Sequence, residues 1–320
     1  MLKKFDKYDR TILFELDKNA RISTTELAKK LRKSKQFVDY RIKKLEKEKI
    51  IVGYTTVIDY SKLGYTSIRI YFKLHNLTPE QQKKIENELI KDEEVWWLVT
   101  LEGPWDIAYA MAVDNILKFY DYWDKIMNKY RKYILKRSVV MYTHIKQYPK
   151  SYIIGKPNTS KGTLIGTSTE TIKIDDTDKK ILKIIADKAK MPLLEISNKL
   201  KTSPQVIRNH IKKLEQVRII QGYRALIDVS HLGYRYYKAY INLLNTNKIK
   251  QLDAFCAYHP NILNTNRTIG GRDYEIELQS QSFQEFENIM NELRTQFIGM
   301  IDEYEFVIAK EEKKMIYFPF

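Results

Sequence analysis

Four side chains that can bind nucleic acid lie at helical spacing around residue 208: a glutamine, an arginine, an asparagine and a lysine. Gln205, Arg208, Asn209 and Lys212 stand three or four residues apart, so a helix would place all four on one face. Arginine and asparagine make bidentate hydrogen bonds with guanine and adenine, and lysine neutralises phosphates. This face therefore suits the major groove of double-stranded DNA. A solvated helix with ordinary polar residues is the alternative.

A related stretch lies around residue 40. Its outer face would carry Lys35, Gln36, Tyr40 and Lys43. Asp39 does not fit, because a carboxylate in the groove faces phosphates unless it accepts from cytosine. Since the second stretch has no acid on its outer face, we expect it to be the better reader of DNA. The expected DNA contacts also include the serines that begin the two helices, Ser34 and Ser203.

A winged helix-turn-helix would position each of these faces. The inner stripes are aliphatic: Val38, Ile42 and Leu45 in one helix, and Ile207, Ile211 and Leu214 in the other. In the first case, a helix from near Asp9 and a short helix capped by Ser23 come before it. Residues 48–58 then alternate like strands around a small turn, which predicts a β-wing.

The chain contains this arrangement twice. Ile-Lys-Lys-Leu-Glu recurs intact, and an offset of 169 residues holds without a gap from Asp9 and Asp178 to Tyr65 and Tyr234. A period this long indicates a tandem duplication of a domain pair rather than a solenoid of small repeats.

Each copy continues with a βαββαβ pattern. The first has strands at 67–74, 95–101, 107–113 and 134–148, with helices from 79 and over 115–130. The second starts near Tyr236, with helices at 248–258 and 283–297 and strands at 262–269, 274–279 and 302–311. This order predicts a four-stranded antiparallel sheet with both helices on one face. The fold class is α+β: two winged helix-turn-helix domains and two ferredoxin-like βαββαβ sensor domains in tandem.

Both faces of the first sheet are apolar, because Trp96, Trp97, Leu98 and Val99 follow one another. The helix-free face needs a cover, and another such sheet is the cheapest one. We therefore expect an internal pseudo-dimer and a homo-oligomer. In the second sheet Glu275 and Glu277 make one strand face acidic; it is either solvated, which we favour, or lines a ligand pocket.

The predicted domains are residues 1–59 (winged helix-turn-helix), 60–152 (sensor), 173–228 (second winged helix-turn-helix) and 229–320 (second sensor). Residues 153–172 join them, and the Gly/Ser/Thr-rich part at 155–169 is aperiodic. As a flexible coil it would span roughly 20–25 Å on average.

Composition agrees with a polyanionic partner. The formal charge is +16 and the pI is about 9.4, although a biased genome would also produce a lysine-rich chain. The single cysteine, Cys256, is expected to be buried filler in a reducing cytosol. No signal peptide or membrane span is expected, so we predict a cytoplasmic protein without metal or cofactor.

Together these motifs resemble the Lrp/AsnC (feast/famine) transcriptional regulators. The resemblance rests on Asp-x-x-Ile-Leu, Ser-x-x-x-(Val/Ile)-x-x-x-Ile-Lys-Lys-Leu-Glu, Ile-Ile-x-Gly-Tyr and Leu-Gly-Tyr, twice over. It implies dimerisation through the sensor sheets and DNA binding by the third helices. The usual member has one copy, so a fused pair resembles a covalent pseudo-dimer with two different readers.

The resemblance also implies amino-acid effectors near a Gly/Asp turn, represented here by Gly103, Asp106, Gly270 and Asp273. The second turn has Arg272 where the family pattern has an aromatic residue. A hairpin that needs positive φ and an aspartate cap would explain the same residues.

Two other functions remain open. One is a nonspecific architectural DNA-binding protein. The other is an enzyme like the sirohaem decarboxylases, whose paired architecture this chain resembles. That reading requires His and Arg on the middle sensor strands, yet the five histidines are scattered along the chain. We therefore predict a sequence-specific DNA-binding regulator and not an enzyme.

Overall fold

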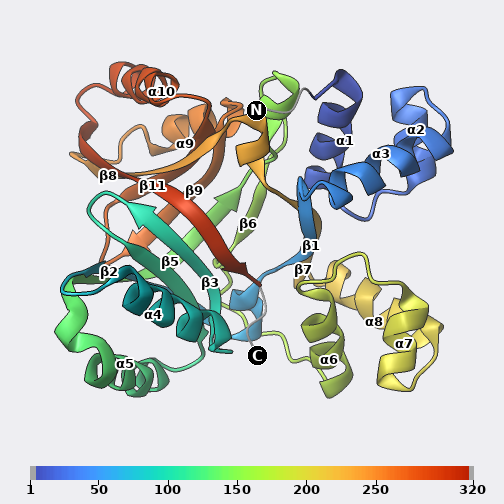
Figure 1. Ribbon diagram of the computed structural model, residues 1–320, viewed down its shortest axis with the longest axis horizontal. Coiled ribbons are helices and arrows are strands. Elements are labelled where there is room, and N and C mark those ends of the chain that lie inside the picture. The colour runs from blue at the N-terminus through green and yellow to red at the C-terminus, as the bar shows by residue number, and fades with distance from the viewer. Residues whose placement is uncertain (1–4, 317–320) are drawn as a thin grey trace.

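Three helices form each of two lobes at one side of the molecule (Figure 1). The computed structural model describes residues 5–316. The first lobe contains α1 (Lys7–Lys18), α2 (Thr24–Leu31) and α3 (Lys35–Lys47), and the second contains α6 (Asp176–Ile185), α7 (Leu193–Leu200) and α8 (Pro204–Gln216). The third helices begin at the predicted serines. Ser34 Oγ accepts from the Phe37 backbone N–H at 3.1 Å, and Ser203 Oγ accepts from that of Val206 at 3.2 Å.

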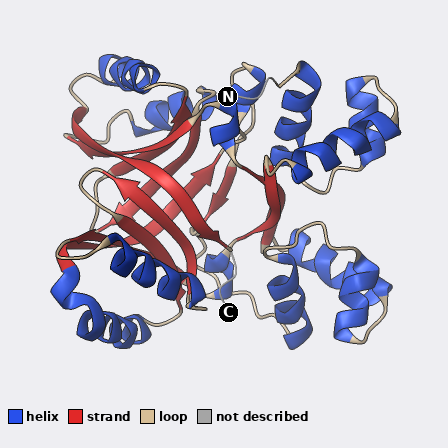
Figure 2. Cartoon of the chain, in the orientation of Figure 1, coloured by secondary structure: helices blue, strands red, loops and turns tan. Residues whose placement is uncertain are grey.

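The strand after each third helix pairs with the other copy. β1 (Ile51–Ile58) and β7 (Ile220–Ile227) form a two-stranded antiparallel ribbon in which Tyr54 opposes Ala225 and Thr56 opposes Tyr223. The ribbon lies between the lobes (Figure 2). The expected pair of strands around a small turn within residues 48–58 is therefore wrong: a turn at residues 48–49 leads into a single strand. Eight residues run straight on as one strand, and the open edge finds its hydrogen bonds in the duplicate.

The two sensor units close into one barrel. The first unit contributes β2 (Thr66–Leu74), β3 (Val95–Glu102), β4 (Ile107–Val113) and β5 (Ile134–Gln147); the second contributes β8 (Arg235–Leu243), β9 (Ile262–Ile269), β10 (Tyr274–Ser280) and β11 (Ile301–Met315). Each unit forms the expected four-stranded antiparallel sheet, with the strand orders β5-β2-β4-β3 and β11-β8-β10-β9. The units join at their edges through β3–β11 and β5–β9.

Helices surround the outside of the barrel, as Figure 2 shows. They are α4 (Pro79–Lys91), α5 (Ile116–Tyr130), α9 (Ile249–Tyr258) and α10 (Phe283–Gln296). Short 3-10 turns occur at η1 (Tyr60–Leu63), η2 (Arg131–Tyr133), η3 (Ser151–Ile154) and η4 (Val229–Leu232). The helix-free faces thus cover each other, as predicted, because the two sheets curve into one closed wall. Within residues 5–316 no helix is long and apolar enough to cross a membrane.

The acidic face of β10 points into this barrel. Glu275 is 1% exposed and Glu277 is 3% exposed, so the favoured prediction of a solvated face is wrong. Arg69 lies 2.9 Å from Glu277, and Lys238 lies 2.7 Å from Glu275 and 3.2 Å from Glu277. Burial alone would raise the pKa of Glu277, but Lys238 and Arg69 hold it well below its usual value. Edge-to-edge closure, which a strand pattern does not reveal, is the reason for the burial.

The segment between the copies is packed, contrary to the predicted flexible coil. Thr163–Ile165 form β6, which pairs with β5 so that Ile145 opposes Ile165. Ile165 is fully buried, and Asn158 Nδ2 donates to the Ala257 carbonyl at 2.8 Å. A Gly/Ser/Thr-rich composition removes the signal of a strand, but an open edge on β5 still binds the segment.

Candidate nucleic-acid interface

The outer face of α3 is exposed to solvent, as the sequence predicted. Val38, Ile42 and Leu45 are buried against α1 and α2, at most 7% exposed. The opposite side exposes the predicted residues Lys35, Gln36, Tyr40 and Lys43, and Tyr40 is 66% exposed. An exposed tyrosine beside lysines is available to stack or to donate to a phosphate oxygen. Asp39 is half-buried and lies at the margin of this face.

The outer face of α8 is a row of amide and cationic side chains. Gln205, Arg208, Asn209 and Lys212 are all exposed. Gln205 Nε2 donates to Asn209 Oδ1 at 2.9 Å, so the two amides are held side by side along the helix. The helix buries Ile207, Ile211 and Leu214. The structure thus brings the predicted residues of each helix together on one surface.

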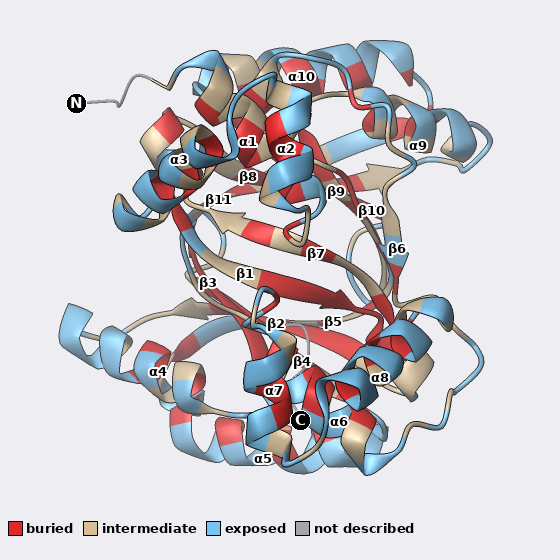
Figure 3. Cartoon of the chain, turned by 90° about the vertical axis from the view of Figure 1, so that its right-hand side faces the viewer, coloured by how far each residue is buried: buried red, intermediate tan, exposed pale blue. Residues whose placement is uncertain are grey.

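The two faces belong to different lobes on either side of the β1–β7 ribbon. Figure 3 looks onto the lobes, with α3 and α8 flanking the ribbon and their outer residues exposed. Ser34 and Ser203 stand at the starts of the helices, where their hydroxyl oxygens serve as caps. Backbone N–H groups and positive helix ends at these positions favour phosphate.

Carboxylates at the start of each lobe's first helix bind α3 or α8, the two recognition helices, and sequence reasoning missed these contacts. In the first lobe Arg41 of α3 lies 3.0 Å from Asp9 and 2.9 Å from Asp6. The equivalent residues in the second lobe, 169 positions later, are His210, Asp178 and Asp175. The repeated aspartate at the start of the duplication, Asp9 and Asp178, was the available signal.

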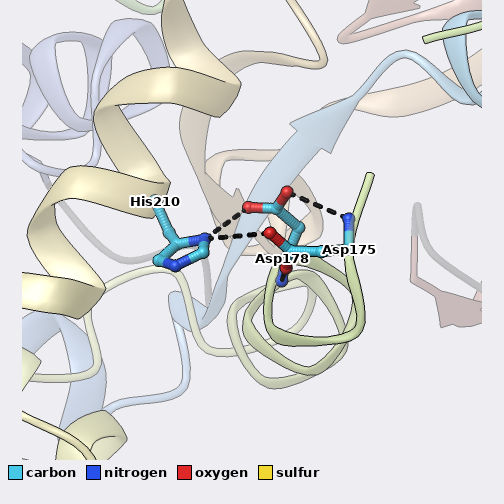
Figure 4. A group of neighbouring side chains, drawn as sticks. All are labelled: Asp175, Asp178 and His210. Atoms are coloured by element: carbon cyan, nitrogen blue, oxygen red, sulfur yellow. Dashed lines mark hydrogen bonds and ion pairs between the residues drawn. The ribbon is translucent and has the colours of Figure 1, made fainter. Parts of the chain in front are cut away.

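Figure 4 shows the second of these clusters. His210 Nδ1 lies 2.7 Å from Asp178 Oδ1, and Lys213 Nζ lies 2.8 Å from Asp178 Oδ2. Burial alone would raise the pKa of Asp178, but hydrogen bonds from Lys213 and His210 hold it below its usual value. Asp175, Asp178 and His210 place three potential metal-ligand atoms within 4.8 Å of one another. Because His210 and Lys213 already bind Asp178 directly, the cluster serves as an ion-pair connection between α6 and α8.

The two glycine turns have the geometry of tight hairpins. Gly103 has φ +119° and Gly270 has φ +83°, which explains glycine at both positions. Asp106 accepts from the Leu74 backbone N–H at 2.7 Å, and Asp273 accepts from that of Leu243 at 2.8 Å. Each aspartate therefore ties its turn to the end of a neighbouring strand. Effector binding at these four residues stays a prediction.

Known proteins resemble both the lobes and the whole chain. A family model described as winged helix-turn-helix DNA-binding matches residues 5–52 and 174–221. The HTH-type transcriptional regulator FL11 of Pyrococcus horikoshii is 26% identical over 148 residues, 46% of this chain and 97% of the relative. An HTH-type transcriptional regulator of Pyrococcus furiosus is 33% identical over 118 residues, 36% of this chain and 77% of the relative.

The fold as a whole is similar to a solved structure of the siroheme decarboxylase NirDL. That likeness has a TM-score of 0.64 and covers 97% of this chain and 93% of the other, at 13% sequence identity. It defines the architecture of paired helix-turn-helix and sensor units. Within that architecture, the chain belongs to the HTH-type transcriptional regulators and carries the winged helix-turn-helix DNA-binding domain twice.

Proposed function

We propose that the chain is a sequence-specific, DNA-binding transcriptional regulator that uses α3 and α8 as two different readers of one site. The observation that supports this most is the exposed face of α8, where Arg208 and Asn209 are exposed beside Lys212. Arginine and asparagine are the side chains that discriminate guanine and adenine in the major groove. The +16 formal charge supplies the sequence-independent attraction that brings the protein to DNA.

The two faces differ, so the recognised site is asymmetric. The first reader presents Lys35, Gln36, Tyr40 and Lys43, and the second presents Gln205, Arg208, Asn209 and Lys212. With both helices on one molecule, the half-sites lie about one helical turn, or a multiple of it, apart. The protein then acts as a covalent pseudo-dimer in the cytoplasm. We also propose that chains associate further into a homo-oligomer. An amino-acid-like effector would bind at the Gly103 and Gly270 turns.

Selection from random-sequence DNA, followed by gel shift with Arg208→Ala and Asn209→Ala, tests this function. We expect each variant to lose about 1–3 kcal/mol of binding free energy on the selected site and to relax the preference at one base position. Arg235→Ala and Asn247→Ala are matched controls, because these exposed residues lie on the barrel unit. Unchanged affinity and preference in both α8 variants would refute the assignment. Equal affinity for selected and unrelated DNA would instead indicate an architectural binder.

The likeness to a decarboxylase favours a second test. We propose that the chain is not an enzyme of that class, because the barrel interior is filled by its own ion pairs. Arg69 and Lys238 compensate Glu277 and Glu275, and all four side chains are at most 6% exposed. Incubation with sirohaem, followed by absorption spectroscopy, should leave the tetrapyrrole spectrum unchanged. A new spectrum or released carbon dioxide would contradict this part of the proposal.

A further inference from the structure

Each lobe places a cation on a tyrosine of the other copy. The Arg21 guanidinium carbon lies 3.9 Å from the centroid of the Tyr223 ring, and Lys190 Nζ lies 4.4 Å from that of Tyr54. Arg21 and Lys190 are 169 residues apart, as are Tyr54 and Tyr223, so the two contacts are equivalent in the duplication. A cation over an aromatic face is attracted by the ring quadrupole, more strongly when water is excluded.

Both tyrosines also contact a recognition helix. The Tyr54 hydroxyl donates to Glu46 of α3 at 2.5 Å, and the Tyr223 hydroxyl donates to Glu215 of α8 at 2.5 Å. Tyr54 and Tyr223 stand on the β1–β7 ribbon. Burial raises the pKa of both phenols above the usual value, so the donors stay protonated. A continuous path therefore runs from a cation of one copy, through a ribbon tyrosine, to the recognition helix of the other copy.

The two paths differ in strength. Arg21 also donates through Nε to the Ala189 carbonyl at 2.7 Å and through a terminal nitrogen to the Tyr223 hydroxyl at 3.0 Å. The planar guanidinium of Arg21 thus contacts both the ring and the hydroxyl of Tyr223. Lys190 keeps a single point charge over Tyr54. Arginine at such a stacked, multiply bonded position is not equivalent to lysine.

We infer that Arg21 and Lys190 are positioning residues that set the separation of the two DNA readers, Arg21 more firmly than Lys190. This rests on the proposed function. Neither residue stands on a recognition helix, so their effect on DNA is exerted through Tyr223 and Tyr54. The chain should therefore tolerate changes in half-site spacing poorly, and the tolerance should depend on these two cations.

The test is a series of DNA duplexes in which bases are inserted between the half-sites of the sequence selected by the wild type. Half a helical turn carries one half-site to the opposite face of the duplex. We therefore expect wild-type affinity to fall about tenfold or more there and to stay low at a full turn of about 10 base pairs, which restores the face of the duplex but moves the half-site away by about 34 Å. Arg21→Met keeps an unbranched, flexible stem and removes the guanidinium with its charge and its hydrogen bonds. It should lower affinity for the selected site and flatten the spacing profile. Lys190→Met should flatten it less.

Two further variants separate positioning from other effects. Lys29→Met removes an exposed cation of α2 and should shift affinity by one common factor at every spacing. Tyr223→Phe keeps the ring but removes the hydroxyl that accepts from Arg21 and donates to Glu215, and it keeps the test available if Arg21→Met fails to fold. A wild-type spacing profile in Arg21→Met, or in Tyr223→Phe where Arg21→Met does not fold, would overturn the inference. Absence of wild-type binding to any selected DNA would refute the proposed function itself, which distinguishes the two failures.

Discussion

Asp178 connects the second recognition helix to the first helix of its lobe. Its side chain is fully buried and accepts from both His210 and Lys213. At pH 7 we expect Asp178→Asn to lower the free energy of unfolding by about 1–3 kcal/mol. Asp176→Asn is the matched control, because the Asp176 side chain is 88% exposed, and it should have almost no effect. Urea unfolding followed by circular dichroism measures both.

The same variant should show a characteristic pH dependence. A carboxylate whose folded pKa lies below its unfolded value stabilises the protein above the unfolded pKa, and that stabilisation is lost as the pH falls through the folded pKa. The pKa of Asp178 is lowered in this way. The difference between wild type and Asp178→Asn should therefore be full above about pH 5 and shrink below about pH 4. A difference that grows on acidification would contradict the assigned ion pair.

For single residues, the sequence predicted the exposed side chains of α3 and α8 better than the buried charges of the barrel. The outer residues of α3 and α8 follow from periodicity alone, because a known aliphatic stripe fixes which side is exposed. Glu277 was wrongly predicted to be solvated, because the alternation along β10 shows only that its two faces differ and not which one is buried. The partner that makes burial tolerable, Arg69, lies 208 residues away in the chain. No local pattern carries that pairing.

Strand β1 of the first copy is hydrogen-bonded to the end of α6 in the second copy. Thr56 Oγ1 donates to the Ile185 carbonyl at 2.6 Å, and Thr55 Oγ1 donates to the Ala186 carbonyl at 2.8 Å, at the end of α6. Thr56 is fully buried. Thr56→Val keeps the shape but leaves that carbonyl without its hydroxyl donor, so we expect a loss of about 1–3 kcal/mol in unfolding free energy.

Exposed Thr25 on α2 gives the control for this change, since Thr25→Val should alter stability by about 0.5 kcal/mol or less. Thermal and urea unfolding of both variants would measure the difference. Equal effects of the two substitutions would show that the cross-copy contact contributes nothing.

The helices and strands of the barrel and the lobes were predicted in the right order, but the β1–β7 ribbon and β6 were not predicted. Helix caps and alternating strands are local signals, and both copies carry them. The β1–β7 ribbon and β6 depend instead on strand edges supplied from far away in the chain. The local sequence does not show which distant strand edge is left open for pairing.

The two halves of the molecule are complementary in charge. β2 and β8 each contribute one cation at equivalent positions, Arg69 and Lys238, and β10 contributes the two carboxylates that pair with them, Glu275 and Glu277. The first half has alanine at 108 and 110, where the second has Glu275 and Glu277. Outside the barrel, fully buried Asp17 of the first half lies 2.8 Å from Arg224 of the second.

A double-mutant cycle tests this complementarity. Arg69→Met leaves the buried Glu277 with less compensation, and we expect a loss of about 3–5 kcal/mol in unfolding free energy. Arg69→Met combined with Glu277→Gln retains the pair of Lys238 and Glu275. It should be less destabilised than the sum of its two single variants by about 0.5–3 kcal/mol. Simple additivity would contradict the pairing.

The asymmetric barrel interior also restricts which halves can pair and which substitutions each half tolerates. Two first halves would enclose two guanidiniums with alanines opposite them, and two second halves would enclose four carboxylates with two ammonium groups. Only unlike halves give a neutral interior, so mispairing carries its own penalty. Within one chain, a substitution of any of these four charged residues is therefore constrained by the charge that the other half places opposite it.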